Sequence, residues 1–575
     1  MAVTSELEPI PAHDTDVDLL VIGSGVGLAA ALAAHDRGLR VLVVEKTAWV
    51  GGSTARSGGA FWIPANPVLE RAGAADTLER AEQYLRSVVA DGAPEPRWRA
   101  FLRHGPDTVR LLERTTPLRF CWARGYSDYH AEHPGGSAAG RSCESRPFDA
   151  SVLGSERARL RGGVMELPLP VPVTGADYRW LNLATRRPDK AVPRLLARVA
   201  QGVGGMALGR EYLAGGQALA AGLYAGVLRA RIPVWTRTTA LHLLTDPTES
   251  VASEGRPGQR VVGALLEQDG RRVQVRARAG VVLSSGGFDH DTALRHQHQS
   301  SLLQPGWSLG AEGNTGDGLR LAHDVGADTA LMDQAWWFPA VAPLRGAAPQ
   351  VLLAERSLPG SFMVDQSGRR FVNEACDYMS FGQRILQRER DGEPVSEMWL
   401  VFDRRYRNSY VLAGSLMPFQ PLPRAWYDQG IAHRARTPQA LARAAGLPER
   451  AFAETFQRFG QLAAAGIDDD FGRGAGAYDR YYGDPTVTPN PTMRPLLEGH
   501  LHAVRVVLSD LGTCGGVRAD ELGRVLRADG SPIEGFYAIG NAAANVFGRS
   551  YPGAGATIGQ GLVYASIAAC HAAES

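Results

Sequence analysis

The chain contains 575 residues, with 61 Lys and Arg against 60 Asp and Glu and a formal net charge of +1. This length predicts more than one domain, and the even charge gives no reason to expect nucleic acid or an anionic membrane as a partner. The five cysteines are scattered without a CxxC pair, which is typical of reduced thiols in a cytoplasmic protein and not of a metal site. The acidic start of the chain lacks the features of a secretory signal, and no apolar run is long enough to span a bilayer. Contact with a membrane is therefore expected to be peripheral at most.

A strand, a glycine turn, a helix and a second strand follow one another between residues 18 and 45. The turn contains Gly23, Gly25 and Gly27. In a dinucleotide site such glycines let the backbone approach a pyrophosphate at the helix N-terminus, and an acid on the second strand binds a ribose hydroxyl. Glu45 lies 22 positions after Gly23, where that acid is expected, and Lys46 follows it. Gly27 falls two residues after Gly25, one fewer than in the usual spacing.

A second glycine-rich segment, 50–64, reads VGGSTARSGGAFWIP. Two glycine pairs separated by short hydroxyl side chains can lay bare backbone and hydrogen-bond donors along a long phosphate-bearing ligand, which favours FAD over NAD. The alternative, a flexible surface loop, is disfavoured by the large apolar residues at 61–63. The residues expected to contact the cofactor here are Gly51, Gly52, Ser53, Thr54, Ser57, Gly58 and Gly59.

The elements that follow are predicted from the spacing of apolar residues. Helices are expected over 72–91, 98–115 and 217–229, and the glycine- and proline-rich stretch 134–180 is expected to be mainly loop. Strands are expected at 233–235 and 240–244, followed by a polar loop over 246–259, an antiparallel meander at 260–266 and 272–278, and a buried strand at 280–283.

Three further glycine turns recur later in the chain. Two of them end predicted strands, where the cofactor edge of a parallel sheet is expected. The third precedes a helix and is equally consistent with a cofactor loop and with an ordinary helix cap. The cofactor-binding residues predicted in these turns are Ser285, Gly286 and Gly287, then Asn314 and Asp317, and finally Gly540 and Asn541.

The middle of the chain lacks these glycine turns. We therefore predict an α/β fold in which a Rossmann-like FAD-binding domain, with a parallel sheet and a small antiparallel meander, is interrupted by an α+β catalytic cap domain. The predicted divisions are 1–336 for the first part of the FAD-binding domain, 337–509 for the catalytic domain and 510–575 for the second part. Substrate binding is expected in a cleft between the domains, because ligand pockets favour domain interfaces.

Segment 550–557 reads SYPGAGAT and precedes an apolar helical run. It places the phenol of Tyr551 one tight turn before a helix N-terminus, whose backbone N–H groups have no partner within the helix. Fixed donors of this kind stabilise a carbonyl oxygen as it gains negative charge. A glycine-rich turn that merely caps a helix is the alternative for this segment alone.

The chain contains a series of such blocks in a fixed order. They are DLLVIGSG, EKTAWVGGSTARSGGAFWIP, GYSDYHAEHPGG, GGFDHD, NTGDG, LMDQAWW, RFVNEACDY, YDRYYGDP, SDLGTCGG and YPGAGATIG. Their arrangement resembles the flavoprotein family that contains fumarate reductases and 3-ketosteroid dehydrogenases, and within it the 3-ketosteroid Δ1-dehydrogenases. The resemblance implies bound FAD and removal of hydrogen from C1 and C2 of a 3-keto steroid.

The resemblance also implies roles for individual residues. Tyr551 and the N–H of Gly555 bind the C3 carbonyl oxygen, Tyr378 removes a C2 proton with the assistance of Tyr129, and C1 gives hydride to flavin N5. Ala556 and Ile558 are expected beside the cofactor. A tyrosine has an ordinary pKa of about 10, so it acts as a base only when its phenolate is stabilised or its proton has a relay.

Two positions depart from the family pattern. Ala554 replaces a common proline, which leaves the N–H of Gly555 in place, and Cys514 stands where a lysine is usual, for which the sequence offers no physical reason.

Other interpretations remain open at the level of sequence. A 3-ketosteroid Δ4-(5α)-dehydrogenase requires the same flavin and carbonyl site with a base on the other side of the ketone. A fumarate-reductase-like ene reductase requires cationic groups for a dicarboxylate, which Tyr551 does not supply. A non-catalytic flavin or steroid binder is a third alternative. Residues 336–338 are equally consistent with a steroid pocket and with the core, and the electron acceptor is not indicated.

Overall fold

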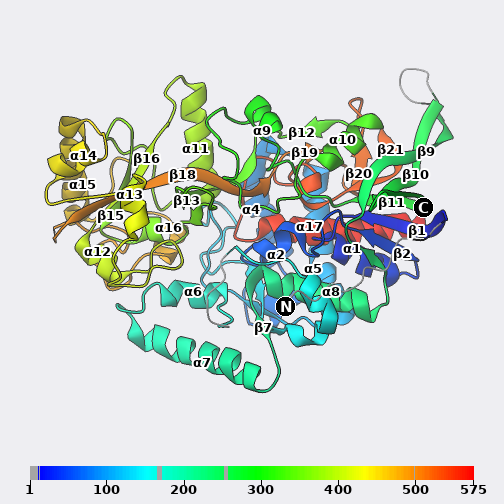
Figure 1. The fold of residues 1–575 in the computed structure, drawn as a ribbon, viewed down its shortest axis with the longest axis horizontal. Helices are drawn as coiled ribbons and strands as arrows, with labels where there is room; N and C mark the ends of the chain where they lie inside the picture. The colour runs from blue at the N-terminus through cyan, green and yellow to red at the C-terminus, as the bar shows by residue number, and fades with distance from the viewer. Residues whose placement is uncertain (1–10, 12, 165–170, 252–256, 498) are drawn as a thin grey trace.

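The computed structural model describes residue 11 and residues 13–164, 171–251, 257–497 and 499–575. Two large sheets lie toward opposite ends of an elongated molecule (Figure 1). The first sheet is built from strands within residues 15–283 and 524–538, and the second from strands within 335–513, which lie between them in the sequence.

The first sheet has a parallel core in the order β21, β11, β1, β2, β8. The short strand β20 pairs antiparallel with β21, and β9 and β10 add an antiparallel extension to the first half of β11. The strands are β1 (Thr15–Ile22), β2 (Val41–Val44), β8 (Val234–Trp235), β9 (Thr239–Val251), β10 (Pro257–Gln268), β11 (Arg271–Leu283), β20 (Arg524–Leu526) and β21 (Pro532–Ala538). The predicted combination of a parallel sheet and an antiparallel meander is confirmed.

The second sheet is antiparallel throughout, in the order β14, β13, β18, β16, β15, with β17 paired to β18. The strands are β13 (Ala335–Val341), β14 (Gln350–Val351), β15 (Ser361–Asp365), β16 (Met398–Asp403), β17 (Ala432–Ala435) and β18 (Leu501–Thr513). β18 runs from this sheet back toward the first one (Figure 1). This antiparallel sheet with its own helices is the α+β unit that the sequence predicts, and the exact domain divisions at 337 and 509 stay predictions.

Smaller strands complete the β-structure. They are β3 (Ala60–Trp62), β4 (Phe120–Trp122) and β5 (Ser142–Ser145) in one sheet, β6 (Phe148–Asp149) with β7 (Tyr212–Leu213), and β12 (Thr329–Ala330) with β19 (Gly516–Val517).

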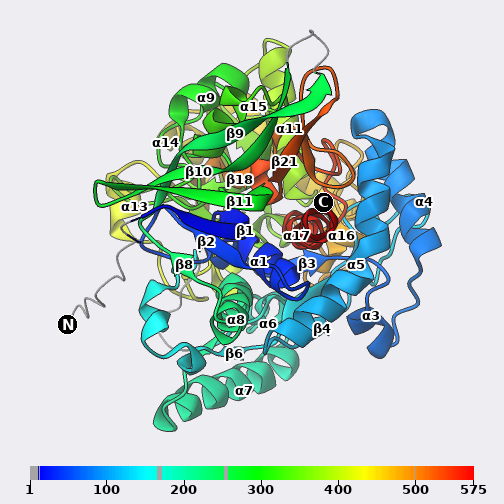
Figure 2. The same cartoon turned by 90° about the vertical axis from the view of Figure 1, so that its right-hand side faces the viewer.

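The helices cover both sheets (Figures 1 and 2). Up to residue 298 they are α1 (Gly27–His35), α2 (Gly52–Arg56), α3 (Pro67–Arg71), α4 (Leu78–Val89), α5 (Glu95–Thr115), α6 (Gly175–Leu181), α7 (Pro188–Ala207), α8 (Gly215–Arg229) and α9 (Thr292–His298). Beyond it they are α10 (Asp317–Asp324), α11 (Tyr378–Arg390), α12 (Arg404–Ser409), α13 (Arg424–Asp428), α14 (Pro438–Ala444), α15 (Glu449–Ala465), α16 (Ala477–Tyr481) and α17 (Ala556–Glu574).

Helix α1 is apolar around its whole circumference, because it is packed against β1, α8 and the C-terminal helix α17. Every residue of α1 except His35 is buried. A helix with this pattern belongs in the interior of a large protein. The packing brings the N-termini of α1 and α17, which lie at opposite ends of the sequence, into one layer beneath the first sheet (Figure 2).

Two predicted boundaries are wrong. The polar stretch 246–259 was expected to be a loop, but β9 continues to Val251 and β10 begins at Pro257, with residues 252–256 outside the described part of the chain. These strands extend beyond the core as a two-stranded ribbon, so their pairing does not require alternating apolar residues. The first expected helix begins six residues late, at Leu78, because Thr77 caps it by accepting a hydrogen bond from the N–H of Arg80.

Among the helices of the described residues, none combines the length and the apolar character needed to cross a membrane.

Candidate active site

The turn before α17 positions Tyr551 and Gly555. Gly555 is the N-cap residue of α17 with φ 89°, and a Cβ atom added there would lie 2.2 Å from the carbonyl oxygen of Ala60. The carbonyl oxygen of Gly555 accepts a hydrogen bond of 3.1 Å from the N–H of Trp62 in β3. Only glycine combines this φ with so close an approach. The predicted turn between a phenol and a helix N-terminus is therefore present and is fixed against β3.

Three tyrosines from distant parts of the sequence meet beside this turn. The ring centroid of Tyr551 lies 5.1 Å from that of Tyr129 and 5.6 Å from that of Tyr378, and the rings of Tyr129 and Tyr378 are 5.3 Å apart. The Tyr129 hydroxyl donates a hydrogen bond to the Tyr378 hydroxyl. The structure thus brings together the three tyrosines that were predicted from separate motifs.

The hydroxyl of Tyr551 is surrounded by donors. The Thr557 hydroxyl donates to it over 3.3 Å. Burial raises the pKa of Tyr551, while hydrogen bonds from Thr557, from Tyr378 and from the backbone of Gly555 and Thr557 act in the opposite direction. The phenol therefore stays protonated at neutral pH and is available as a donor beside the Gly555 N–H.

Burial also raises the pKa of Tyr378 and Tyr129 well above the ordinary value. Tyr126 continues the cluster, because its ring lies 6.5 Å from that of Tyr129, measured between centroids, and burial raises its pKa to about 12. The Tyr482 hydroxyl donates to the Tyr126 hydroxyl over 3.0 Å. The four phenols thus lie together as two hydrogen-bonded pairs, Tyr129 with Tyr378 and Tyr482 with Tyr126.

Buried charges hold the segment that carries Tyr129. Asp128 accepts a hydrogen bond of 2.8 Å from the indole N–H of Trp62 and forms an ion pair with Arg141, and both charged side chains are fully buried. Burial raises the pKa of Asp128 to about 6, although Arg141 lowers it. The N–H of Tyr129 donates over 3.1 Å to the carbonyl oxygen of Pro552. The loop of Tyr129 is therefore attached directly to the turn that carries Tyr551.

Tyr378 is the first residue of α11, and Asp377 caps this helix by accepting a hydrogen bond of 2.9 Å from the N–H of Ser380. The buried guanidinium of Arg356 donates to the carbonyl oxygens of Glu374 and Cys376, at 2.6 and 2.5 Å. The cap by Asp377 and the hydrogen bonds from Arg356 to the preceding turn thus hold the start of α11, and with it the phenol of Tyr378, in a defined position.

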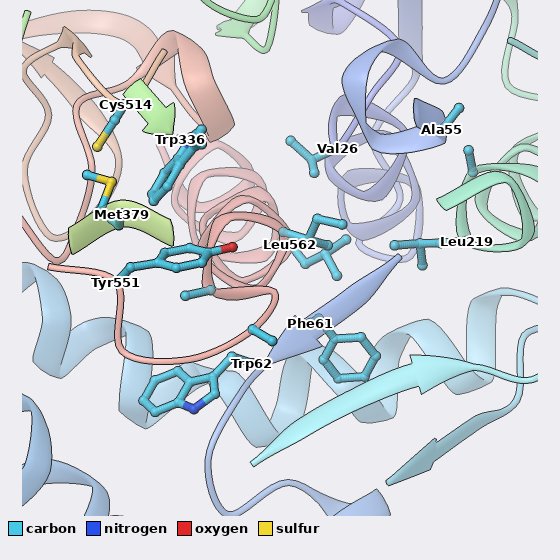
Figure 3. Packing of buried hydrophobic residues seen from close by; sticks show 14 of the residues in the cluster. Val26, Ala55, Phe61, Trp62, Leu219, Trp336, Met379, Cys514, Tyr551 and Leu562 are labelled. Carbon is cyan, nitrogen blue, oxygen red and sulfur yellow. The ribbon is translucent and has the colours of Figure 1, made fainter. Parts of the chain in front are cut away.

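The walls beside Tyr551 are apolar. Trp336 lies 5.0 Å from the Tyr551 ring, measured between centroids, and Met379 belongs to the same buried cluster (Figure 3). Trp337 faces the opposite side of β13, where it packs on α11 at Gly382. Of the two tryptophans left undecided by sequence, Trp336 lines the site and Trp337 belongs to the core. A cleft of about 250 Å³ reaches Tyr551 from the side of Asp377 and Arg549.

The first glycine turn lies between β1 and α1 as expected. A Cβ atom at Gly23 would lie 2.2 Å from the carbonyl oxygen of Ser284, and one at Gly27 would lie 2.9 Å from the side chain of Val21. Gly27 therefore provides the close contact between helix and strand despite the shortened spacing. Glu45 follows β2, where its carboxylate accepts hydrogen bonds from the Ser24 hydroxyl at 2.7 Å and the Thr47 hydroxyl at 2.8 Å.

The second glycine segment lies directly against the first. A Cβ atom at Gly52, at the start of α2, would lie 3.5 Å from the Cα of Gly25. The N-termini of α1 and α2 therefore approach each other with bare backbone between them. Within this segment Thr54 is buried and Gly59 packs on α8 at Gly215, whereas Ser53 and Ser57 are partly exposed and Gly58 is exposed.

The later turns assemble around the same place. Asn314 donates over 3.0 Å to the hydroxyl of Ser53, and Lys46 forms an ion pair with Asp317. A Cβ atom at Gly286 would lie 2.3 Å from the side-chain oxygen of Asn314. Asp317 begins α10, and Asn314 contacts the second glycine segment at Ser53 and the later turn at Gly286, so a cofactor role for segment 313–318 stays a prediction.

The remaining predicted cofactor residues lie between the glycine turns and the three tyrosines. Asn541 accepts a hydrogen bond of 3.0 Å from the indole N–H of Trp336, and a Cβ atom at Gly540 would lie 2.8 Å from Val26 at the start of α1. Ala556 and Ile558 are buried in the first turn of α17. These residues connect the glycine loops with the tyrosine cluster.

The residues present fit FAD. Two glycine-lined helix N-termini suit a pyrophosphate, and a carboxylate after β2 suits a ribose. The hydroxyls of Ser284 and Ser285 are buried without a hydrogen-bond partner among the described residues. Because buried polar groups are normally hydrogen-bonded, these two hydroxyls suit a polar ligand. The residues that would hold the cofactor include Gly25, Glu45, Gly52, Ser285 and Asn314.

The fold and the site define a dinucleotide-binding flavoprotein with a tyrosine-lined cleft beside the cofactor loops. The chain belongs to the family described as FAD binding domain, whose profile matches residues 18–558. FAD is accordingly its cofactor.

Comparison with known proteins extends over nearly the whole chain. It is 42% identical over 571 residues to a 3-oxosteroid 1-dehydrogenase of Mycobacterium tuberculosis, covering 97% of this chain and 98% of that protein. It is 34% identical over 551 residues to a 4-oxocyclohexanecarboxylate 2-dehydrogenase of Sinomonas cyclohexanicum, covering 94% and 90%. The crystal structure of a 3-ketosteroid delta1-dehydrogenase from Sterolibacterium denitrificans, in complex with 1,4-androstadiene-3,17-dione, superposes with a TM-score of 0.89 at 35% identity and covers 97% of this chain and all of that one.

Sequence reasoning missed several residues of the site. Thr557 contacts the Tyr551 hydroxyl, Ser24 contacts Glu45, and Arg356 supports the turn before Tyr378. Thr557 and Ser24 lie inside glycine motifs, so their position was a usable signal. Arg356 gives no local signal, because its partners are backbone oxygens about twenty residues away.

Proposed function

We propose that this protein is an FAD-dependent 3-ketosteroid Δ1-dehydrogenase, which introduces a double bond between C1 and C2 of a 3-keto steroid. The observation that carries the proposal is the convergence of the Tyr551 hydroxyl, the Gly555 N–H and the hydrogen-bonded pair of Tyr378 and Tyr129. The sequence identity with the Mycobacterium tuberculosis enzyme and the structural likeness to the Sterolibacterium denitrificans enzyme support the same activity.

Tyr551 and Gly555 bind the C3 carbonyl oxygen of the substrate in this proposal. Their hydrogen bonds strengthen as the oxygen becomes enolate-like, so they lower the barrier for loss of the C2 proton more than they stabilise the ground state. Thr557 orients the Tyr551 phenol by donating to its oxygen, which leaves the phenol hydrogen for the ketone.

Tyr378 receives the C2 proton. It acts as the phenolate, and the hydrogen bond that Tyr129 donates to its oxygen lowers the pKa of Tyr378 and so favours that form. When bound, FAD accepts the hydride that leaves C1, so that the substrate loses one proton and one hydride and gains one C–C double bond.

The catalytic side chains come from both parts of the molecule. Tyr378 begins α11 beside the second sheet, whereas Tyr551 and Gly555 precede α17 beneath the first. We assign residues 337–509 to a catalytic domain and residues 1–336 and 510–575 to an FAD-binding domain on this basis.

Anaerobic reaction of the purified protein with a panel of ketones tests the proposal. The panel contains a 1,2-saturated 3-keto steroid, a 5α-saturated 3-keto steroid with a C1–C2 double bond already present, and 4-oxocyclohexanecarboxylate. The first compound is expected to bleach the flavin and to give a C1–C2 alkene. Reaction of the second compound with formation of a C4–C5 alkene would establish the Δ4-(5α) activity instead, and reaction of the third alone would exclude a steroid substrate. A yellow protein that no ketone bleaches would be a binder and not an enzyme.

A further inference from the structure

Arg356 differs in its partners from the other arginines that are buried as deeply. Among the described residues, Arg141, Arg356 and Arg473 are fully buried, and Arg141 and Arg473 form ion pairs with buried carboxylates. Arg356 donates through one terminal nitrogen to two backbone carbonyl oxygens, and its other two nitrogens have no hydrogen-bond partner in the described part of the chain. No carboxylate is therefore hydrogen-bonded to this guanidinium.

The guanidinium of Arg356 nevertheless stays charged. Burial acts to lower its pKa, but nearby acidic groups raise that pKa above the ordinary value. The phenol of Tyr478 contributes most to this increase, followed by Cys376, Asp377 and Asp479. A buried charge is costly unless a partner of opposite charge balances it. The position of Arg356 therefore calls for an explanation beyond its two bonds to backbone oxygens.

The carboxylates around Arg356 are engaged elsewhere. Asp377 and Asp479 lie within electrostatic range of the guanidinium, and Glu355 precedes it in the chain. All three carboxylates accept hydrogen bonds from backbone N–H groups. They balance the charge of Arg356 only in part, because none of them is hydrogen-bonded to it.

Tyr478 connects Arg356 with the tyrosine cluster. Its ring centroid lies 4.5 Å from that of Tyr129 and 6.5 Å from that of Tyr126, and its hydroxyl is buried without a hydrogen-bond partner among the described residues. Burial raises the pKa of Tyr478 well above the ordinary value, whereas Arg356 acts in the opposite direction. Arg356 acts in the same way on Tyr126, whose pKa burial raises to about 12. Its charge therefore reaches the oxygens of the cluster.

Arg356 also lies close to the start of α11, where Tyr378 is the first residue. Its guanidinium contacts the carbonyl oxygen of Cys376, two residues before Tyr378, at 2.5 Å. Its Cζ lies 5.9 Å from the ring centroid of Phe381, three residues after Tyr378. The free N–H groups of the helix N-terminus add partial positive charge at the same end. A positive charge in this place favours the negative form of a neighbouring acidic group.

We propose that Arg356 supplies the positive charge that stabilises Tyr378 as a phenolate. This inference rests on the proposed function, in which Tyr378 receives the C2 proton in that form. A buried phenolate is disfavoured without a counter-charge, because burial penalises the charged form. The hydrogen bond from Tyr129 favours the phenolate but brings no positive charge. Arg356 acts on the reaction through Tyr378 and is therefore a positioning residue.

Titration of position 378 tests the proposal without a substrate. A fluorinated tyrosine at this position, in the holoprotein, is followed by fluorine NMR as the pH is raised. Fluorination makes the phenol more acidic, which brings its midpoint closer to the range in which the protein is folded. Arg356→Met removes the charge, and Arg356→Lys retains it. The control is Arg407→Met, because Arg407 is also buried and also donates to two backbone carbonyl oxygens, but lies in α12.

The midpoint is expected to rise by about one pH unit or more in Arg356→Met, and to stay close to that of the wild type in Arg356→Lys and Arg407→Met. One unit corresponds to about tenfold less phenolate below the midpoint, so a 3-keto steroid should reduce the flavin of Arg356→Met about tenfold more slowly. If thermal unfolding shows that Arg356→Met is not folded, Arg356→Gln takes its place, because its amide retains a donor for the carbonyl oxygens.

An unchanged midpoint in the folded neutral variant would overturn the proposal. An equal rise in Arg356→Lys would also overturn it, since the bonds to the turn and not the charge would then set the midpoint, and so would an equal rise in Arg407→Met. If the midpoint rises as expected but no 3-keto steroid bleaches the flavin, the proposed function fails and the electrostatic effect of Arg356 stands. If the ketone bleaches the flavin and the midpoint does not move, the inference about Arg356 alone fails.

Discussion

Tyr551 and Gly555 act as a pair because the turn between them is fixed by contacts from outside it. The carbonyl oxygen of Pro552, inside the turn, accepts hydrogen bonds from the N–H of Tyr129 at 3.1 Å and from the Tyr84 hydroxyl at 2.6 Å. The donors are therefore held in place before a substrate arrives. Preorganised donors are effective because no reorganisation is required when charge develops.

The variant Tyr551→Phe removes one donor to the carbonyl oxygen and leaves the packing of the ring unchanged. Turnover is expected to fall by about 100-fold or more, as for removal of a donor from an oxyanion site. The bound flavin is expected to remain. Steady-state rates and the flavin absorbance per protein measure the two effects. A suitable control is Tyr537→Phe, a tyrosine whose hydroxyl contacts His571 away from the cluster. Equal activity of the wild type and Tyr551→Phe would remove Tyr551 from the mechanism.

Tyr378 gives the reaction a pH dependence whose direction follows from burial. Its pKa is raised well above the ordinary value, so the phenolate is scarce at neutral pH and becomes more abundant as the pH rises. The rate of flavin reduction is expected to increase by up to about tenfold per pH unit between about pH 6 and pH 10. Stopped-flow measurement at each pH gives this slope, and Tyr378→Phe is expected to lose both the rate and the slope. A wild-type rate that decreases with pH would exclude a phenolate base.

Single residues of the site were predictable only where a motif carried them. Tyr551 and Gly555 lie in one glycine-rich turn, and Tyr378 ends the block RFVNEACDY, one of the blocks that resemble the family. Arg356 was not predictable, because a buried arginine whose partners are carbonyl oxygens leaves no pattern in the local sequence.

The element that determines the site is the turn into α17. A methyl group at Gly555 would meet the backbone of β3 and would also force a side chain into the left-handed region of φ. Gly38 has φ 85°, close to the 89° of Gly555, but nothing lies within 4 Å of an added Cβ there. An alanine at Gly38 therefore measures the destabilisation caused by the positive φ alone, and an alanine at Gly555 measures that effect together with the steric clash.

Gly555→Ala is expected to lower the free energy of unfolding by about 3 kcal/mol or more, because strain and a steric clash add together. Gly38→Ala is expected to cost about 1 kcal/mol from the dihedral angle alone. Denaturant unfolding of both variants measures the difference, and turnover is expected to be lost in Gly555→Ala only. Equal destabilisation would show that the contact with Ala60 carries no energy.

The glycine turn before α1 makes a separate prediction about the cofactor. A Cβ atom at Gly25 would lie 3.4 Å from the Thr54 hydroxyl, so Gly25→Ala is expected to fold. The methyl group would stand where the pyrophosphate is expected, and the affinity for FAD should fall by about tenfold or more. Titration of the apoprotein with FAD measures the affinity, with Gly204→Ala in the surface helix α7 as the control, since nothing lies within 4 Å of a Cβ there. Unchanged affinity would place the pyrophosphate elsewhere.

At the level of elements, the parallel strands and the helices with a regular apolar period were predictable, and the irregular extensions were not. β9 and β10 continue through a polar segment because they pair with each other beyond the core. Helix α7 was not predicted, because its apolar side faces outward. Both cases depend on surroundings that a local pattern does not encode.

The whole molecule joins a cofactor layer to a second sheet through β18 and the tyrosine cluster. Helices α11 and α17 begin at the same place from different parts of the fold, and their first residues or caps are Tyr378 and Gly555. The order of the glycine turns predicted this arrangement, because their interruption marks the inserted segment. The relative position of the tyrosines follows only from the tertiary contacts between the two parts.

The central claim is that the protein binds a ketone oxygen through Tyr551 and Gly555 and that this contact permits dehydrogenation. Anaerobic stopped-flow reduction of the flavin by a 3-keto steroid and by the same steroid lacking the C3 oxygen tests it most directly. The ketone is expected to bleach the flavin of the wild type rapidly and that of Tyr551→Phe about 100-fold more slowly, while the deoxygenated steroid leaves both unchanged. Bleaching of the wild-type flavin by the deoxygenated steroid at the rate of the ketone would contradict the account.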